Sequence, residues 1–272
     1  MNSKNITILV PLHGLSPTDV TFNLNFSEWF NKCVKSIEQA NAKPGKILFI
    51  CPKNNEFEDF FSKWECPDGL DYSIIYNEGK TDFCSQINLG VESTETEYFS
   101  ILEHDDEYSN IWLSQFNEYV KHYEDVDIFF PLVVDTDEQG GFIGFTNEAV
   151  WAMGFSEELG FLDNNTALKY QNFQVSGMIM KKDKFEEIGG LKPSIKLTFN
   201  YEFLLRATYN DAVIMTIPKV GYKHTNQRVN SLFWNYKNKA SEKLSQEEAK
   251  FWVELAKKEY FFTADREVVY EN

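Results

Sequence analysis

Short, continuous apolar runs alternate along the chain with longer stretches in which apolar residues recur every three or four positions. The continuous runs are rich in β-branched and aromatic residues and predict buried strands at 6–10, 46–51, 72–76, 98–102 and 127–134. The periodic stretches predict helices at 27–41, with Ser27 as cap, and at 56–64, 82–92 and 109–123. Strands and helices alternating at this spacing indicate an α/β fold, a mixed, mostly parallel sheet flanked by helices.

The second half of the chain continues this pattern around one long stretch, 135–172, that is rich in Gly, Asn and acidic residues. Such a stretch predicts a functional loop. Further strands are expected at 175–180 and at 213–217, the latter ended by Pro218, with helices at 182–188 and 200–209. Ser245 to Glu248 form a capping box before a final helix. We therefore predict a domain over residues 1–231 and a C-terminal helical extension over residues 232–272 that packs on it.

The charge balance excludes some classes of partner. The 272 residues carry 26 Lys and Arg against 42 Asp and Glu, a net charge of -16. General nucleic-acid surfaces and polybasic membrane patches need clustered cations, so neither is expected. The four cysteines lie far apart, and we read them as free thiols in a reducing compartment. With no apolar run long enough for a span, we expect a cytoplasmic protein without a transmembrane segment. None of these sequence features indicates an oligomeric state.

One acidic turn concentrates the chemistry of the chain. Glu103, His104, Asp105, Asp106 and Glu107 follow a predicted strand and precede a predicted helix. Ligands of open α/β sheets bind at this edge, beyond the ends of the strands. Crowded carboxylates raise one another's pKa unless a cation neutralises them, and Mg²⁺ or Mn²⁺ would do so while also taking phosphate oxygens. The alternative is a solvated loop in which Asp106 or Ser109 caps the next helix.

Taken in order, several short motifs resemble those of glycosyltransferase family 2 and its relatives with the GT-A fold, over roughly residues 4–231. They are the strand ending in Val10-Pro11, the turns Asn77-Glu78-Gly79 and Asn88-Leu89-Gly90, the strand and acidic turn from Tyr98 to Asp106, the Gly189-Gly190-Leu191 turn, the helix from Asn200 to Arg206, the strand ending in Pro218, and His224. The resemblance implies a GT-A (Rossmann-like) domain and a metal-dependent glycosyltransferase. The donor that it implies is a nucleotide-sugar of the UDP-sugar class. The acceptor that it implies is a hydroxyl group of a carbohydrate or glycoconjugate.

The resemblance also assigns roles to residues. It implies a Mn²⁺ or Mg²⁺ site made by Asp105, Asp106 and His224, with Asp106 and Glu202 as catalytic groups. It places the donor against Pro11, His13, Asn77, Gly79, Lys80, Glu103 and Asp105. The alternative role for Glu202 is a structural ion pair on the helix surface with Arg206, four residues later. Trp151, Phe155 and Phe161 either stack against an acceptor sugar or form part of the core.

The chain departs from the family pattern at three places. Its second strand ends in Cys51-Pro52, where the family has an Asp that contacts the base, and its acidic turn starts with Glu103 in place of Asp. Asn200 stands where the family has its catalytic Asp, and an amide does not accept a proton at neutral pH, so either Glu202 is the base or the mechanism differs.

Two other functions stay open. One is a catalytically inactive carbohydrate- or protein-binding module that has kept the fold. The other is a nucleotidyltransferase, which usually carries a Gly-rich, basic first loop. Residues 11–18 hold no Lys or Arg, so this function ranks last.

Overall fold

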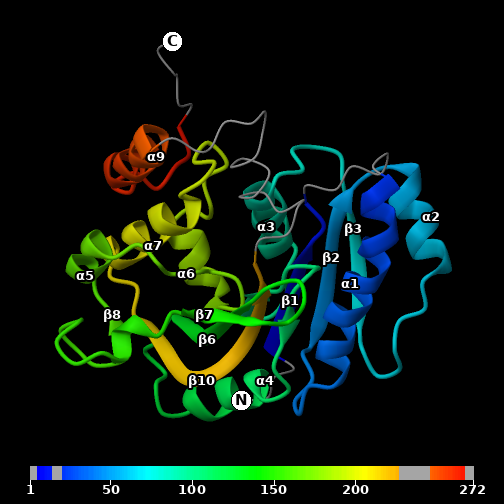
Figure 1. Ribbon diagram of the computed structural model, residues 1–272, viewed down its shortest axis with the longest axis horizontal. Helices are drawn as coiled ribbons and strands as arrows, with labels where there is room; N and C mark the ends of the chain where they lie inside the picture. The colour runs from blue at the N-terminus through cyan, green and yellow to red at the C-terminus, as the bar shows by residue number, and fades with distance from the viewer. Residues whose placement is uncertain (1–4, 14–19, 227–245, 267–272) are drawn as a thin grey trace.

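The computed structural model describes residues 5–13, 20–226 and 246–266. A mixed, mostly parallel sheet runs through the molecule and helices cover its faces, which confirms the predicted fold class (Figure 1). The strand order is β3-β2-β1-β4-β9-β6-β10-β5, with β7 paired to β6 and β8 to β10. Strands β1 to β4 pair in parallel, so the loops that follow them gather at one edge of the sheet.

The first half of the chain supplies the parallel strands. They are β1 (Ile6–Pro11), β2 (Lys46–Pro52), β3 (Tyr72–Asn77) and β4 (Tyr98–Ile101), and the helices between them are α1 (Val20–Glu38), α2 (Asn55–Lys63) and α3 (Phe83–Glu92). Helix α1 begins one to two turns before the predicted start, and Ser27 lies inside it instead of capping it. Phe26 is buried and contacts Phe30, so the apolar stripe already runs through this earlier turn.

The second half adds shorter strands and the remaining helices. They are β5 (Glu107–Tyr108), α4 (Trp112–Tyr119), β6 (Ile128–Thr136), β7 (Phe142–Thr146), a 3₁₀ turn (Ala149–Trp151), β8 (Phe161–Leu162), α5 (Asn164–Lys169), β9 (Ile179–Lys181), α6 (Lys182–Glu187), α7 (Phe199–Tyr209), β10 (Ile214–Thr225) and α9 (Gln246–Glu259). The stretch 135–172, predicted as one loop, therefore contains β7, β8 and α5. Trp151, Phe155 and Phe161 are partly buried against the core, which fits the second of their two predicted roles.

Strand β10 does not end at Pro218, as the proline predicted, but continues to Thr225. Its pairing with β6 shifts register between Thr216 and Val220 and again between Val220 and Tyr222. A proline is tolerated at such an irregularity, where the ladder is already interrupted. The strand bends there and is drawn as a curved arrow in Figure 1. Near its end, Tyr222 and Lys223 pair with β5, directly after the acidic turn.

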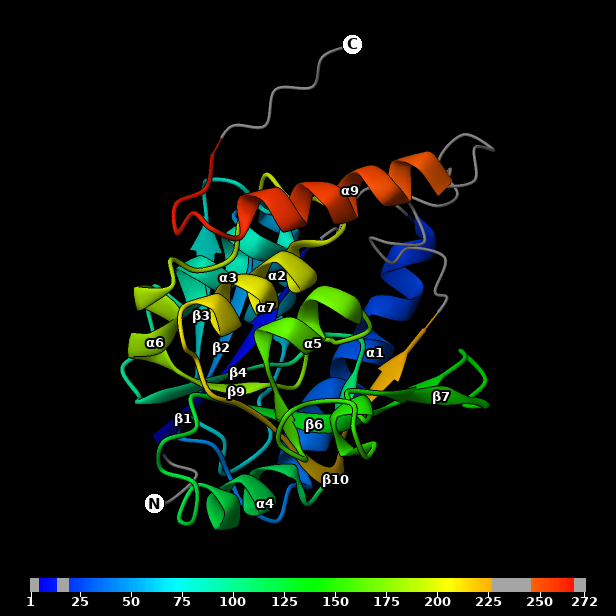
Figure 2. The same cartoon turned by 90° about the vertical axis from the view of Figure 1, so that its left-hand side faces the viewer.

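Helix α9 packs across α7 (Figure 2). Thr198 Oγ1 donates to the carbonyl of Trp252 at 2.8 Å, and Lys192 Nζ donates to the carbonyl of Glu259 at 2.7 Å. The predicted domain boundary at 231/232 and the predicted cap at Ser245 lie outside the described residues. No helix in the described ranges combines the length and apolar character that a membrane crossing requires.

Candidate functional site

The acidic turn lies between β4 and β5, and its central carboxylate is buried. Asp106 is only 1% exposed. It caps no helix, because α4 begins after Ile111 without a side-chain cap. Ser109 instead donates its hydroxyl to the carbonyl of Val220 at 2.7 Å. The alternative of a solvated, capping loop therefore does not describe Asp106 or Ser109.

Three groups near the end of β10 hold the Asp106 carboxylate. The Tyr222 hydroxyl donates to Oδ2 at 2.9 Å, and the Thr225 peptide N–H donates to Oδ1 at 2.9 Å. The His224 ring lies with Nδ1 2.9 Å from Oδ2. Tyr222 also accepts a hydrogen bond from the peptide N–H of Glu103 at 3.1 Å. The end of β10 thus fixes both the backbone and the central carboxylate of the turn.

Burial and charge have opposite effects on the pKa values of Asp106 and His224. Burial raises the pKa of the Asp106 carboxyl, and the His224 ring beside it only partly offsets that rise. Burial acts to lower the pKa of the His224 imidazole, but the Asp106 carboxylate outweighs it and raises that pKa to about 9. Each side chain thus favours the charged form of the other. A metal ion would have to displace the imidazole proton before binding this nitrogen.

Glu103, Asp106 and His224 form a cluster suited to a divalent cation. One ligand atom from each lies within 4.8 Å of the other two. Glu103 Oε1 accepts a hydrogen bond from Ser176 Oγ at 2.6 Å, and Oε2 lies 4.0 Å from His13 Nε2. Two carboxylates and an imidazole fit Mn²⁺ well, and Mg²⁺ less well because it prefers oxygen ligands alone. The donor set therefore fits the cation that the resemblance implies.

The structure brings some of the predicted site residues to this cluster. Pro11 ends β1 and His13 follows it, with the His13 ring against Phe83 at 5.0 Å and close to Glu103. Asp105 is the neighbour of Asp106 in the turn but is not a member of the three-residue cluster, and it lines a crevice instead.

The predicted donor turn at residues 77–80 lies farther along the same edge. It follows β3, which β2 separates from β1. Asn77 Oδ1 accepts from the Gly79 N–H at 2.8 Å, and Asn77 Nδ2 donates to the Lys80 carbonyl at 2.7 Å. The Asn77 side chain therefore closes an exposed turn of its own.

Glu202 lies in a separate, fully buried ion cluster. Its Oε1 accepts from Arg206 Nε at 2.9 Å and lies 2.8 Å from Lys192 Nζ, while Oε2 accepts from Arg206 Nη2 at 3.0 Å. All three side chains are at most 1% exposed. This geometry fits the predicted pairing of Glu202 with Arg206, but the pair is buried and does not lie on the helix surface. Asn200, in the first turn of α7, has a buried Oδ1 without a hydrogen-bond partner among the described residues.

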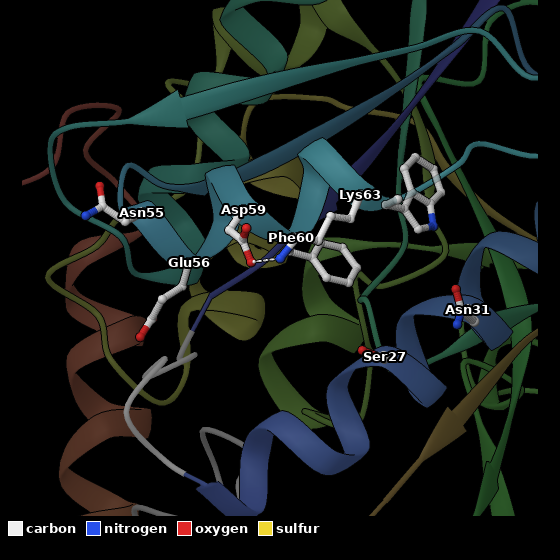
Figure 3. A pocket seen from close by; sticks show the side chains of 8 residues that line it. Ser27, Asn31, Asn55, Glu56, Asp59, Phe60 and Lys63 are labelled. Atoms are coloured by element: carbon white, nitrogen blue, oxygen red, sulfur yellow. Dashed lines mark hydrogen bonds and ion pairs between the residues drawn. The ribbon is translucent and has the colours of Figure 1, made fainter.

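The crevice beside the turn has a volume of about 260 Å³. It is lined by Trp29, Lys32, Asp105, Glu107, Thr136, Asp137, Glu138, Gln139, Gly140, Lys223 and Thr225. A second hollow, of about 550 Å³, lies between α1 and α2 and is lined by none of the predicted site residues (Figure 3). Another hollow, of about 420 Å³, also touches the turn through Glu107, but the crevice is lined by both Asp105 and Glu107.

Sequence reasoning missed Tyr222, Thr225 and Ser176. Tyr222 precedes His224 by two positions, and alternation along a strand places both on one face, so this residue was within reach of the pattern. Thr225 acts through its backbone, and Ser176 lies 73 positions after Glu103, so no local signal marks either of them.

The comparisons with known proteins bear on the fold. No protein-family model matches the chain, and no curated protein matches its sequence. Solved structures that match include residues 1–349 of S. aureus TarS, a glycosyltransferase of the GT-A type. Its complex with UDP matches with a TM-score of 0.59 and 12% identity over 85% of this chain and 62% of that chain. Its complex with UDP-GlcNAc gives 0.58 and 11% over 84% and 59%. This chain thus spans less than two thirds of that protein, and the likeness shows a glycosyltransferase-like fold.

Proposed function

We propose that this protein is a metal-dependent glycosyltransferase that takes a sugar from UDP-sugar and transfers it to an acceptor hydroxyl. The observation that carries the proposal is the cluster of Glu103, Asp106 and His224 at the edge of the sheet. The fold supports it, because the similar structures of TarS hold UDP and UDP-GlcNAc. An oxygen-rich cation site in this fold suits a diphosphate ligand.

The residues of the acidic turn and of the end of β10 have different roles in binding the cation and the donor. Glu103, Asp106 and His224 would hold Mn²⁺ or Mg²⁺, and the cation would offset the negative charge of the leaving diphosphate. Tyr222 and Thr225 keep the Asp106 carboxylate in place before any ligand arrives. In this proposal Asp105 faces the donor and supports the cation from the crevice side.

The nucleoside half of the donor lies at the carboxyl ends of β1 and β3. Pro11 and His13 line it at the end of β1, and the turn of Asn77, Gly79 and Lys80 contacts it from the end of β3. Parallel pairing of β1, β2 and β3 supports this arrangement, because it places both segments on the same edge.

The mechanism also needs a base that deprotonates the acceptor hydroxyl. Glu202 is the base predicted from sequence, but its hydrogen bonds to Arg206 and its ion pair with Lys192 support a structural role. Asn200, at the position of the family base, favours a second candidate function, an inactive module that binds donor without consuming it. Release of UDP from UDP-sugar in the presence of Mn²⁺ separates the two, because only an enzyme consumes the donor.

Thermal unfolding with UDP, GDP and their sugar conjugates, each with Mn²⁺ or with EDTA, tests the proposal. UDP with Mn²⁺ at about a hundred times its Kd should stabilise the fold by about 2.7 kcal/mol, a rise in Tm of roughly 5 to 10 °C. EDTA should abolish the rise, as should Glu103→Gln and His224→Asn. Glu107→Gln is the matched control in the same turn, because Glu107 is outside the cluster. An equal rise without metal, or none with any nucleotide, would refute the proposal.

A further inference from the structure

Strand β7 exposes large apolar side chains at the surface. Phe142 is 62% exposed, Ile143 45% and Phe145 46%. The rings of Phe142 and Phe145 contact each other, with centroids 5.1 Å apart and planes at 59°. We refer to these two rings as the aromatic platform. The β6–β7 hairpin that carries them projects from the body of the molecule in Figure 2. Clustered exposed aromatic side chains are typical of binding surfaces.

The strand register places the platform beside the candidate site. Thr136 of β6 pairs with Phe142 of β7 on one side and with Thr225 of β10 on the other. Thr225 is the residue whose N–H holds Asp106. Phe142 and Thr225 are thus two strand spacings apart, about 10 Å between their Cα atoms.

The crevice described above lies beside the acidic turn, and Thr136, the strand partner of Phe142, is part of its lining. The hairpin contributes Thr136, Asp137, Gln139 and Gly140 to its lining, and the turn contributes Asp105. Carboxylate and amide oxygens accept hydrogen bonds from hydroxyl groups. The crevice therefore offers polar partners, and the two aromatic rings lie on the neighbouring strand β7.

We propose that the aromatic platform and this crevice form the acceptor subsite, and that the acceptor is an uncharged pyranoside. This inference rests on the proposed transferase function. The C–H face of a pyranose ring packs on the electron-rich face of an aromatic ring, and its hydroxyls bond to the crevice oxygens. The lining holds four carboxylates, of Asp105, Glu107, Asp137 and Glu138, against the two ammonium groups of Lys32 and Lys223. An anionic acceptor would therefore be repelled.

The hairpin fits other occupants less well. A second copy of the chain pairing along β7 would meet a strand whose register is already irregular next to Asp135, and such irregularities disfavour edge pairing. An anionic lipid surface would meet Asp137 and Glu138 near the tip, and residues 128–146 include no Lys or Arg. A sugar matches both the rings and the charge.

Saturation-transfer NMR with methyl pyranosides of glucose, galactose, mannose and N-acetylglucosamine tests the inference on the full chain. At least one should bind the wild type, and methyl glucuronide should bind more weakly. The double variant Phe142→Ala/Phe145→Ala should weaken binding at least about fivefold, and so should Phe142→Leu/Phe145→Leu, which keeps apolar surface but loses the rings. Met153→Ala, at a side chain 99% exposed, is the control and should bind normally. Because the altered rings are exposed, the Tm of both double variants should stay within about 2 °C of wild type.

The outcomes separate the inference from the proposed function. Equal pyranoside binding by wild type and both double variants, or none by the wild type, overturns the acceptor subsite even when UDP with Mn²⁺ still raises Tm. Platform-dependent pyranoside binding without any UDP effect instead removes the transferase and leaves a sugar-binding surface. Self-association or vesicle binding that disappears in the double variants, without pyranoside binding, assigns the platform to a protein or lipid partner and overturns the inference.

Discussion

Replacing Glu202 by Gln distinguishes a structural carboxylate from a catalytic one. Glu202 is the only acidic member of its cluster with Lys192 and Arg206, and none of the three side chains is more than 1% exposed. The substitution changes the cluster charge from +1 to +2 without changing its shape. Removing one partner of a buried ion pair typically costs about 3 to 5 kcal/mol. For a chain of this size that corresponds to a fall in Tm of roughly 10 °C.

The pH dependence of the variant gives a second check. Burial lowers the pKa of the Lys192 ammonium, and Glu202 opposes that effect. Without the carboxylate the pKa of Lys192 falls further, so the folded variant binds fewer protons than its unfolded chain. Its stability should then rise with pH, and the deficit relative to wild type should shrink from pH 7 to pH 9.

Thermal unfolding and turnover are measured on the same preparations. Asp59→Asn is the matched control, because Asp59 forms an exposed pair with Lys63 at the same four-residue spacing and at 2.7 Å (Figure 3). An exposed pair is worth at most about 1 kcal/mol, so its Tm should move by only a few degrees. If Glu202→Gln leaves Tm within about 2 °C of wild type and lowers turnover at least about a hundredfold, Glu202 is the base and the structural reasoning is refuted.

Three further changes test other parts of the structure. Tyr222→Phe removes one of the three groups that hold the Asp106 carboxylate, so it should cost about 1 to 3 kcal/mol by denaturant unfolding and weaken Mn²⁺-dependent UDP binding; unchanged values contradict the role of the hydroxyl. The ring of His224, assigned by NMR against His224→Asn, should titrate near pH 9 without metal. Because this pKa is raised, its stabilising contribution is complete below about pH 6.5 and is lost towards pH 9, and Mg²⁺ should lower the midpoint if it binds the ring. Asn88→Ala removes two hydrogen bonds to the backbone of Leu191 and should cost about 2 kcal/mol, whereas a change below 0.5 kcal/mol would show that the turn holds without them.

The sheet and most helices were predictable because their apolar periodicity is local. Strand β7 was not, because Phe142 and Phe145 are exposed and Gly144 lies between them, so the segment lacks the alternation of a half-buried strand. The extent of β10 was missed for a related reason. A proline normally ends a strand, and only pairing with β6, more than 80 residues earlier, shows that Pro218 lies at an irregularity.

The candidate site shows the same limit. The four-residue spacing of Glu202 and Arg206 predicted their pairing, but Lys192 joins them from outside the helix, and spacing does not reveal burial. The acidic turn was recognisable as a unit. Which of its carboxylates is buried depends on partners that follow it by 116 to 119 residues.

The dependence of Asp106 on the end of β10 has a consequence for the order of folding. Contacts between residues so far apart in sequence form late, because closing the intervening loop costs entropy before they are made. During synthesis, the carboxylate gains its hydrogen bonds to Tyr222, His224 and Thr225 only after residues 222 to 225 have left the ribosome. A chain released before that point would carry the whole acidic turn and still lack the groups that hold it. Cation binding at this turn would therefore report that the end of β10 has joined it, and stalled nascent chains of increasing length would acquire it in a single step.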